Sequence, residues 1–189
     1  MFFKNRRQHS DAPKQAMPMV GDVIFFGKNN WEVLAIQDRM ALIISCDSVC
    51  QKPYHHSRTS VTWENCSLRK WLNDEFINTH FTSADRARIK PCRINNDDNP
   101  NYGTPGGAPT SDRVFLLSIG EAENMIQRHM IIKTEIGWWL RSPGQQPDHA
   151  AVVTELGYVS AGGRYVEDSG FHFAGAPLGV RPVLWLSFG

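Results

Sequence analysis

The chain has 189 residues, of which 41% are hydrophobic and 21% are charged, and its formal net charge is +1. This composition is typical of a globular protein that is large enough to bury one sizeable core. The near-neutral charge excludes a global basic field, so the sequence predicts no binding to nucleic acid. No apolar run approaches the roughly 20 residues of a membrane-spanning helix, and the first residues lack the apolar core of a secretory signal. We therefore expect no membrane association and, by default, a cytoplasmic protein.

Residues 1–17 differ in character from the rest of the chain. They carry four lysine and arginine side chains and show no periodic apolar pattern. Segments of this kind at chain ends are commonly unstructured. The sequence therefore predicts a flexible basic tail at residues 1–17, with a short docking arm as the alternative, followed by a single domain at residues 18–189.

Three apolar runs after residue 20 predict an N-terminal β-meander. The first run, Val23–Phe26, and the second, residues 31–36, flank a Gly-Lys-Asn-Asn turn. The third run, residues 40–44, follows a turn at Gln37 and Asp38. Short apolar runs separated by turn residues favour antiparallel hairpins. The polar stretch of residues 47–62 is expected to be a loop.

Two or three helices are predicted to pack on one side of the domain. The first is amphipathic, because its apolar residues recur at a spacing of three and four: Leu68, Trp71, Leu72 and Phe76. Asn65 or Ser67 is its predicted N-cap. A second short helix is expected within residues 82–89. Ser118 and Glu121 form a capping box that begins a third helix after a buried run at residues 114–117.

The loop of residues 95–110 is rich in Asn, Asp, Gly and Pro and is too long to be a simple connector. Oxygen ligands from four of its residues could hold calcium: Asn95, Asp97, Asp98 and Asn99. The same side chains also stabilise turns through hydrogen bonds to nearby backbone, which is the structural alternative. Calcium at this loop is thus the one exception to a prediction of no cofactor. Tyr102 and Trp63 have polar neighbours in the sequence and are expected at the surface.

The last third of the chain predicts a small antiparallel sheet. Residues 150–154 and 158–160 are predicted to be two strands joined by a turn. A segment at 137–144 precedes them, and a closing strand at 180–186 follows them. Pro182 lacks an N–H donor, so its strand should lie at an edge, at a bulge or at the start of a sheet. The large aromatic and arginine side chains are expected to be structural: Trp138, Trp139, Arg141, Arg181 and Trp185.

Taken together, these motifs resemble a bacterial family catalogued as a domain of unknown function. The resemblance runs from Gly21 to Leu186 and includes Trp-Trp-Leu-Arg-Ser-Pro-Gly at 138–144 and Gly-Val-Arg-Pro-Val-Leu-Trp-Leu at 179–186. That family is similar, more distantly, to C-type-lectin-like folds of the formylglycine-generating-enzyme branch. In those folds a closing Gly-aromatic-Arg strand helps to frame a compact sheet with variable loops, and here Val180 replaces the aromatic residue. The resemblance implies an α+β fold of C-type-lectin-like type.

The same resemblance implies non-catalytic binding of a protein or glycan. Some proteins of this architecture are variable ligand-binding products of diversity-generating retroelements, and their changing positions lie just before the closing strand. In this chain that region is residues 145–177, which with residues 95–110 would form the binding loops. The candidate ligand-binding residues mix aromatic and adaptable polar groups: Tyr158, Ser160, Arg164, Tyr165, Asp168, Phe171, His172, Phe173 and, from the earlier loop, Tyr102.

An enzyme on the same fold is one alternative. Formylglycine-generating enzymes need a late cysteine pair, and this chain has no cysteine after Cys92. A different cysteine enzyme would require Cys46, Cys50, His55 and His56 to converge in one pocket. The cysteine spacing matches neither a zinc ribbon nor a disulfide framework, so reduced and mostly buried thiols are expected.

A structural or assembly module is the other alternative. Such a module would belong to a phage particle or to a larger cell-surface protein, so a phage-encoded or surface-displayed location would replace the cytoplasmic default. The assembly-module hypothesis predicts an extensive apolar patch or a stable oligomer in place of a binding pocket.

Overall fold

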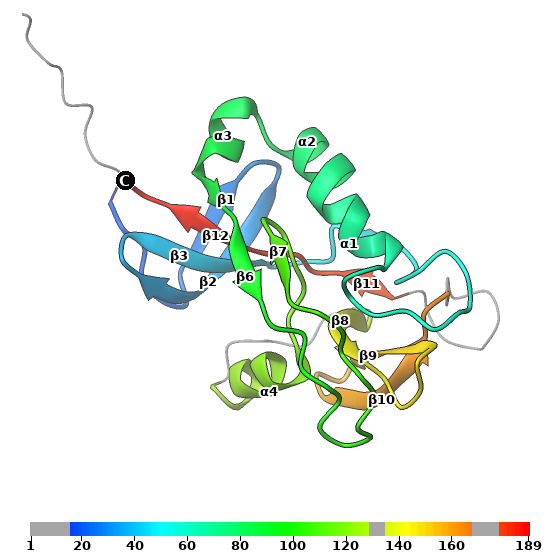
Figure 1. The fold of residues 1–189 in the computed structure, drawn as a ribbon. Helices are drawn as coiled ribbons and strands as arrows, with labels where there is room; N and C mark the ends of the chain where they lie inside the picture. The colour runs from blue at the N-terminus through cyan, green and yellow to red at the C-terminus, as the bar shows by residue number, and fades with distance from the viewer. Residues whose placement is uncertain (1–15, 129–134, 168–177) are drawn as a thin grey trace, which may run out of the picture.

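The computed structural model describes residues 16–128, 135–167 and 178–189. Across these residues the fold is a mixed α+β arrangement of three helical segments and several antiparallel sheets (Figure 1). The predicted α+β class is therefore confirmed. The basic tail lies outside the described residues except for Ala16 and Met17. None of the described helices is long and apolar enough to cross a membrane.

The N-terminal meander forms most of the first sheet. In spatial order its strands are β1 (Val23–Phe26), β2 (Asn29–Gln37), β3 (Met40–Ser45), β12 (Val183–Ser187) and β5 (Ile89–Lys90). All neighbouring pairs are antiparallel, which confirms the predicted meander. The turn between β1 and β2 needs only Gly27 and Lys28. A Cβ on Gly27, whose φ is +61°, would lie 2.6 Å from the Phe81 ring, so glycine is required there.

The second sheet contains the predicted C-terminal hairpin. In spatial order its strands are β10 (Val159–Tyr165), β9 (His149–Val153), β8 (Trp138–Pro143), β11 (Gly179–Val180) and β4 (Cys50–Gln51). β8, β9 and β10 are antiparallel, whereas β11 runs parallel to β8. Two further strands, β6 (Cys92–Ile94) and β7 (Thr110–Asp112), pair with each other at the ends of the long loop.

The predicted closing strand does not complete the C-terminal sheet, and that expectation was wrong. The segment divides at Arg181 and Pro182, so that β11 belongs to the second sheet and β12 lies inside the first. Pro182 has no N–H to donate, and its position just before β12 is one of the three that we predicted. Figure 1 shows the segment running from one sheet into the other. The C-terminal segment is therefore shared by both sheets.

Arg181 lies at the junction of the two sheets. Its side chain is 2% exposed, and its Nε and Nη2 donate to the carbonyl oxygen of Ser45 at 2.9 and 2.8 Å. Its guanidinium carbon is 5.1 Å from the centre of the Trp138 ring. The Ser45 N–H also donates to the Pro182 carbonyl, and the Val49 N–H donates to the Val180 carbonyl. The guanidinium thus connects the end of β3 in one sheet with β8 in the other.

Tryptophans fill much of the core. Trp138 and Trp139 are completely buried, whereas Trp185 is partly buried and packs against the core. Trp63, which we expected at the surface, is only 1% exposed, and its Nε1 donates to Asp112 Oδ2 at 3.0 Å. That expectation was wrong, because a carboxylate 49 residues away in the sequence satisfies the indole. The indole ring can therefore be buried with its polar atom paired.

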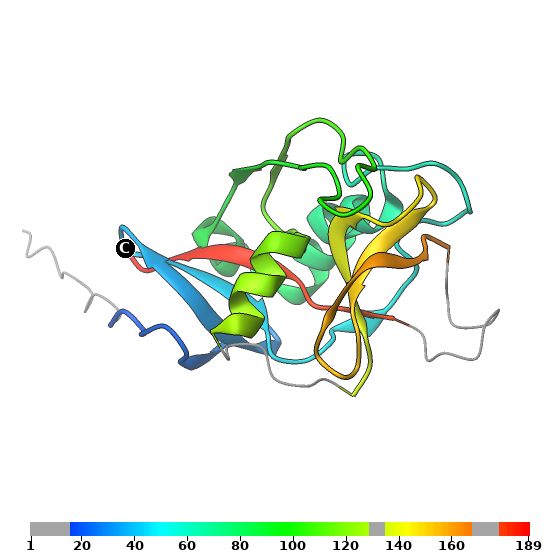
Figure 2. The ribbon, with the colours of Figure 1, turned by 90° about the horizontal axis from the view of Figure 1, so that it is seen from below.

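The helices lie on two sides of the fold. The first helix is continuous and consists of α1 (Ser67–Trp71), a π-helical turn η1 (Leu72–Phe76) and α2 (Ile77–His80). The second helix is α3 (Ser83–Arg88), and the third is α4 (Ile119–Gln127). Figures 1 and 2 show α4 on the opposite side of β12 from α1 and α2, so the prediction of packing on one side was wrong. The predicted Ser118 and Glu121 capping box is confirmed. The first helix, however, is capped by Cys66, whose Sγ accepts from the Arg69 N–H.

We predict that Arg181→Ala destabilises the whole protein by about 3 kcal/mol, because the substitution removes a charged donor and leaves the buried Ser45 carbonyl without partners. Urea denaturation followed by circular dichroism measures the change. Arg93→Ala, at an exposed position, is the control and should change the stability by less than about 0.5 kcal/mol. Equal stabilities of the two variants would contradict the role given to Arg181.

Candidate binding surface

The buried side chain of Asn99 joins the long loop to the second sheet. It is 1% exposed, and its Nδ2 donates to the carbonyls of Pro143 at 2.7 Å and Ala161 at 2.8 Å. Its Oδ1 accepts from the backbone N–H groups of Asn101 at 2.9 Å and Tyr102 at 3.2 Å. One amide therefore caps the turn of its own loop and fastens that turn to β8 and β10.

Arg141 fastens the start of the same loop. The buried guanidinium of this β8 residue donates to the carbonyls of Asn95, at 3.3 Å from Nη2, and Leu116, at 2.8 Å from Nη1. It also forms a bidentate ion pair with Glu121 of α4. Although burial alone would raise the pKa of the Glu121 carboxyl, the hydrogen bonds and charge of Arg141 lower it. Arg141 thus holds α4 and the loop against one strand.

Three of the four predicted calcium ligands, Asn95, Asp97 and Asp98, line one hollow, whereas the side chain of Asn99 is buried in other contacts. Both heavy atoms of the Asn99 amide group are already hydrogen bonded, and Asp98 Oδ1 accepts from the Gly106 N–H at 3.0 Å. Asn95 contributes a main-chain carbonyl to Arg141, and Asp97 is exposed. Within the described part of the chain, no three His, Cys, Asp or Glu side chains are grouped to hold a metal ion. These contacts are those of the turn-capping alternative.

Tyr102 lies beside strand β10. A Cβ on Gly162 would be 3.4 Å from the Tyr102 Oη, so the tyrosine hydroxyl lies next to this part of the strand. Tyr102 is 54% exposed, and Tyr158, just before β10, is 59% exposed. Figures 1 and 2 both show the loop running close to the β9–β10 hairpin. The two predicted binding loops therefore meet along one strand.

β10 is the edge strand of the second sheet and is partly exposed along its whole length. Its pairing with β9 is interrupted between Ser160 and Arg164. Gly163 occupies this irregularity with a φ of +70°, and a Cβ there would lie 2.0 Å from the Ala150 carbonyl oxygen. The residues between Ser160 and Arg164 are alanine and glycine, so the backbone of β10 is covered by little side chain there. Larger side chains lie on both sides of this stretch.

The ring of Tyr165 contacts two other side chains. The guanidinium carbon of Arg58 lies 3.5 Å from its centre, and the His149 ring centre lies at 4.1 Å. Asp148 accepts from Arg58 Nε at 3.0 Å and pairs with His149 Nδ1 at 2.7 Å. Burial alone would raise the pKa of Asp148, but these two hydrogen bonds lower it. Sequence reasoning missed this cluster, because Arg58 is 90 residues from Asp148.

Five of the nine predicted ligand-binding residues are described by the structure. We call them the β10 surface: Tyr102, Tyr158, Ser160, Arg164 and Tyr165. All five are partly or largely exposed. The other four lie outside the described residues: Asp168, Phe171, His172 and Phe173.

The cysteines and histidines weighed for catalysis show no activated thiol. All four cysteines are free, and burial raises the pKa of Cys50 to about 11 and of Cys66 to about 12. His55 stacks on His56 with ring centres 4.1 Å apart, and its Nδ1 accepts from the Ser67 N–H. Burial has the largest effect on the pKa of Cys50, and the charges that act on it are those of Lys52 and Glu75, not of a histidine. A nucleophile needs a thiolate, which such pKa values disfavour.

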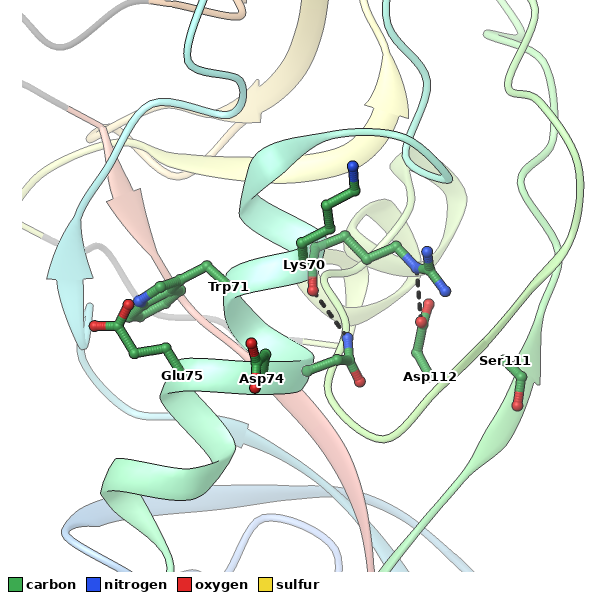
Figure 3. A pocket seen from close by; sticks show the side chains of 8 residues that line it. Lys70, Trp71, Asp74, Glu75, Ser111 and Asp112 are labelled. Carbon is green, nitrogen blue, oxygen red and sulfur yellow. Dashed lines mark hydrogen bonds and ion pairs between the residues drawn. The ribbon is translucent and has the colours of Figure 1, made fainter.

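A wide hollow of about 560 Å³ lies beside the first helix. Figure 3 shows Asp74 and Glu75 on the helix, with Ser111 and Asp112 on the segment across from it. Asp112 accepts from Arg69 Nε at 2.7 Å, and Asn73 Nδ2 donates to the Val114 carbonyl at 2.8 Å. These groups hold the helix, including its π-helical turn, against the neighbouring segment, and we assign them a structural role.

In its described residues the protein is an α+β fold of two five-stranded sheets and one two-stranded sheet, with exposed loops along an edge strand. The chain belongs to the family described as "Domain of unknown function (DUF6273)", whose model matches residues 38–188. Searches of curated proteins and of solved structures find no match. Membership of a family of unknown function agrees with the resemblance noted from the sequence motifs.

We predict that Asn99→Ala destabilises the protein by about 2 kcal/mol, because the substitution removes buried hydrogen bonds at both ends of one amide. Thermal and urea unfolding measure the change. Asn101→Ala, at an exposed position two residues away, is the matched control and should be near neutral. An Asn99→Ala variant as stable as this control would show that the amide does not fasten the loop.

The thiols of Cys50, Cys66 and Cys92 should react slowly with iodoacetamide at pH 8 in the native protein. Burial raises the pKa of Cys50 and Cys92 to about 11 and of Cys66 to about 12, so little thiolate is present at that pH. Mass spectrometry of alkylated peptides measures the rates, with the urea-unfolded protein as the control. If a cysteine is alkylated faster in the native protein than in the urea-unfolded protein, its thiol is activated, which would support the cysteine-enzyme alternative.

Proposed function

We propose that this protein is a non-catalytic binding domain that displays loops on a C-type-lectin-like scaffold and takes a protein or glycan ligand. The observation that carries the proposal is the Asn99 contact, because it places Tyr102 of the long loop beside β10. Loops that are held on a rigid scaffold are common places for binding residues. The proposed contact area is the β10 surface.

The composition of the β10 surface supports this role. Tyrosine offers a large, amphipathic contact area at low conformational cost, and small residues between tyrosines let a ligand approach the backbone. Tyr102 and Tyr158 are more than half exposed, while the contacts of Arg58 and His149 hold the ring of Tyr165. The surface thus combines rigid aromatic groups with the polar groups of Ser160 and Arg164.

The position of β10 in the chain supports a more specific proposal. It lies within residues 145–177, just before the closing segment, where the variable positions of retroelement-diversified proteins are found. We include in the proposal that the domain is such a variable protein and is bacterial. Sequencing related copies tests this directly. Substitutions should be concentrated in residues 145–177, whereas an even distribution along the chain would contradict it.

Two observations favour binding over catalysis. The thiol pKa values are raised by burial, and His55 uses its Nδ1 to accept a backbone hydrogen bond. The assembly-module alternative retains one specific observation in its favour. Exposed apolar side chains are concentrated before and within β1.

The binding proposal predicts a loss of affinity when the tyrosines are truncated. Labelled protein is first applied to arrays of glycans and peptides, and the affinity of any ligand found is then measured by biolayer interferometry. Tyr102→Ala and Tyr158→Ala should each weaken binding at least about tenfold, since exposed aromatic anchors commonly contribute more than 1 kcal/mol.

Both variants should keep the wild-type melting temperature, because the two side chains are largely exposed. Ile36→Ala, an exposed apolar position on the first sheet, is the control and should bind normally. A ligand that binds both tyrosine variants as tightly as the wild type would contradict the assignment of the β10 surface.

A further inference from the structure

The first sheet ends in an exposed apolar edge that has no role in the proposed binding surface. β1 is its outermost strand, and Val23 and Phe25 are 61% and 73% exposed. Met19 and Val20, just before the strand, are 71% and 53% exposed. Monomeric proteins rarely leave such side chains grouped at an open strand edge, so the group marks an interaction surface.

The backbone of β1 offers hydrogen bonds away from the sheet. The Val33 N–H of β2 donates to the Asp22 carbonyl at 2.9 Å, so Asp22 and Val33 form a hydrogen-bonded pair. The pair of Ile24 with Trp31 lies two residues further along the ladder and is of the same kind. Bonded and non-bonded pairs alternate in an antiparallel ladder. The N–H and C=O groups of Val23 and Phe25 therefore point outward, where they can pair with another strand.

Within Val23–Phe26 nothing blocks such pairing, and the one irregularity of this edge lies just before the strand, where Gly21 and Asp22 both bond to Val33. Natural edge strands are commonly protected by lysine, proline or a bulge. Residues Val23–Phe26 read Val-Ile-Phe-Phe, and their pairing with β2 is regular. The nearest charges lie just outside the strand, with Asp22 before it and Lys28 after it.

We infer that β1 pairs antiparallel with β1 of a second copy of this chain, about a twofold axis at Ile24. In this register Val23 of each copy faces Phe25 of the other, which gives two apolar cross-strand pairs and four backbone hydrogen bonds. Asp22 of each copy then lies at the same end of the ladder as Lys28 in the β1–β2 turn of the other, so opposite charges meet at both ends. This pairing joins the first sheets of the two copies edge to edge.

Self-pairing explains the arrangement better than a strand from an unrelated protein. The two outward-facing residues are equally spaced about Ile24, and the opposite charges flank the same centre, as a twofold interface requires. The inference does not depend on the proposed function, because β1 and the β10 surface belong to different sheets.

Sedimentation equilibrium of the full chain tests the inference. The wild type should have twice the mass of one chain, and Phe25→Lys should halve the measured mass by placing two charges in the interface while the circular dichroism spectrum of the folded protein is kept. Leu156→Lys, at an apolar residue that is 54% exposed in the second sheet's hairpin turn, is the matched control and should remain a dimer. A monomeric wild type, or a dimer that Phe25→Lys leaves intact, would overturn the inference.

A cysteine at the twofold axis tests the register and does not rely on the lysine variant. The two Ile24 residues would form a non-hydrogen-bonded pair, whose Cα separation of about 4.5 Å permits a disulfide. Ile24→Cys should therefore give a reducible dimer band after mild oxidation, measured on a non-reducing gel. Glu123→Cys, at an exposed position on α4, is the control for random crosslinking. Equal crosslinking of the two variants would overturn the proposed pairing.

Discussion

The buried guanidinium of Arg181 is the contact on which the arrangement of the two sheets depends. A cation in a protein interior is costly unless strong acceptors and nearby rings replace its water. For Arg181 the Ser45 carbonyl and the Trp138 ring, one from each sheet, replace part of that water, while Nη1 is buried without a hydrogen-bond partner among the described residues. Because the backbone beside it also crosses from β11 to β12, the charge and the chain both connect the sheets.

The same principle recurs in the second sheet, where buried polar groups fasten the loops that reach the surface. Arg141 joins β8 to α4 and to the Asn95 carbonyl, and Asn99 joins the loop to β8 and β10. Each is a polar group that is costly to bury unless it is hydrogen bonded, so each favours one loop position over others. The β10 surface is thus supported from beneath by contacts that do not themselves touch a ligand.

Local sequence patterns predicted the helices and strands well, but they could not predict which distant strands and side chains pair with one another. The meander and the Ser118 capping box depend on neighbours only a few residues apart, and both were correct. The closing strand was misassigned because its partners in β3 and β5 are more than 90 residues away. Trp63 was misplaced for the same reason, since its partner Asp112 is distant in sequence. For the site, the tyrosines could be proposed from composition, but the roles of Asn99 and Arg58 depend on contacts across the fold.

Native-state hydrogen exchange tests most directly whether the two sheets form one support for the β10 surface. The amides of Ile43 in β3 and Val152 in β9 lie in different sheets and at buried positions. If the junction at Arg181 makes the sheets one cooperative unit, both amides should exchange only through global unfolding and report the same free energy of opening. If the Val152 amide opens with a clearly lower free energy while that of Ile43 stays at the global value, the sheets unfold separately and the account is wrong.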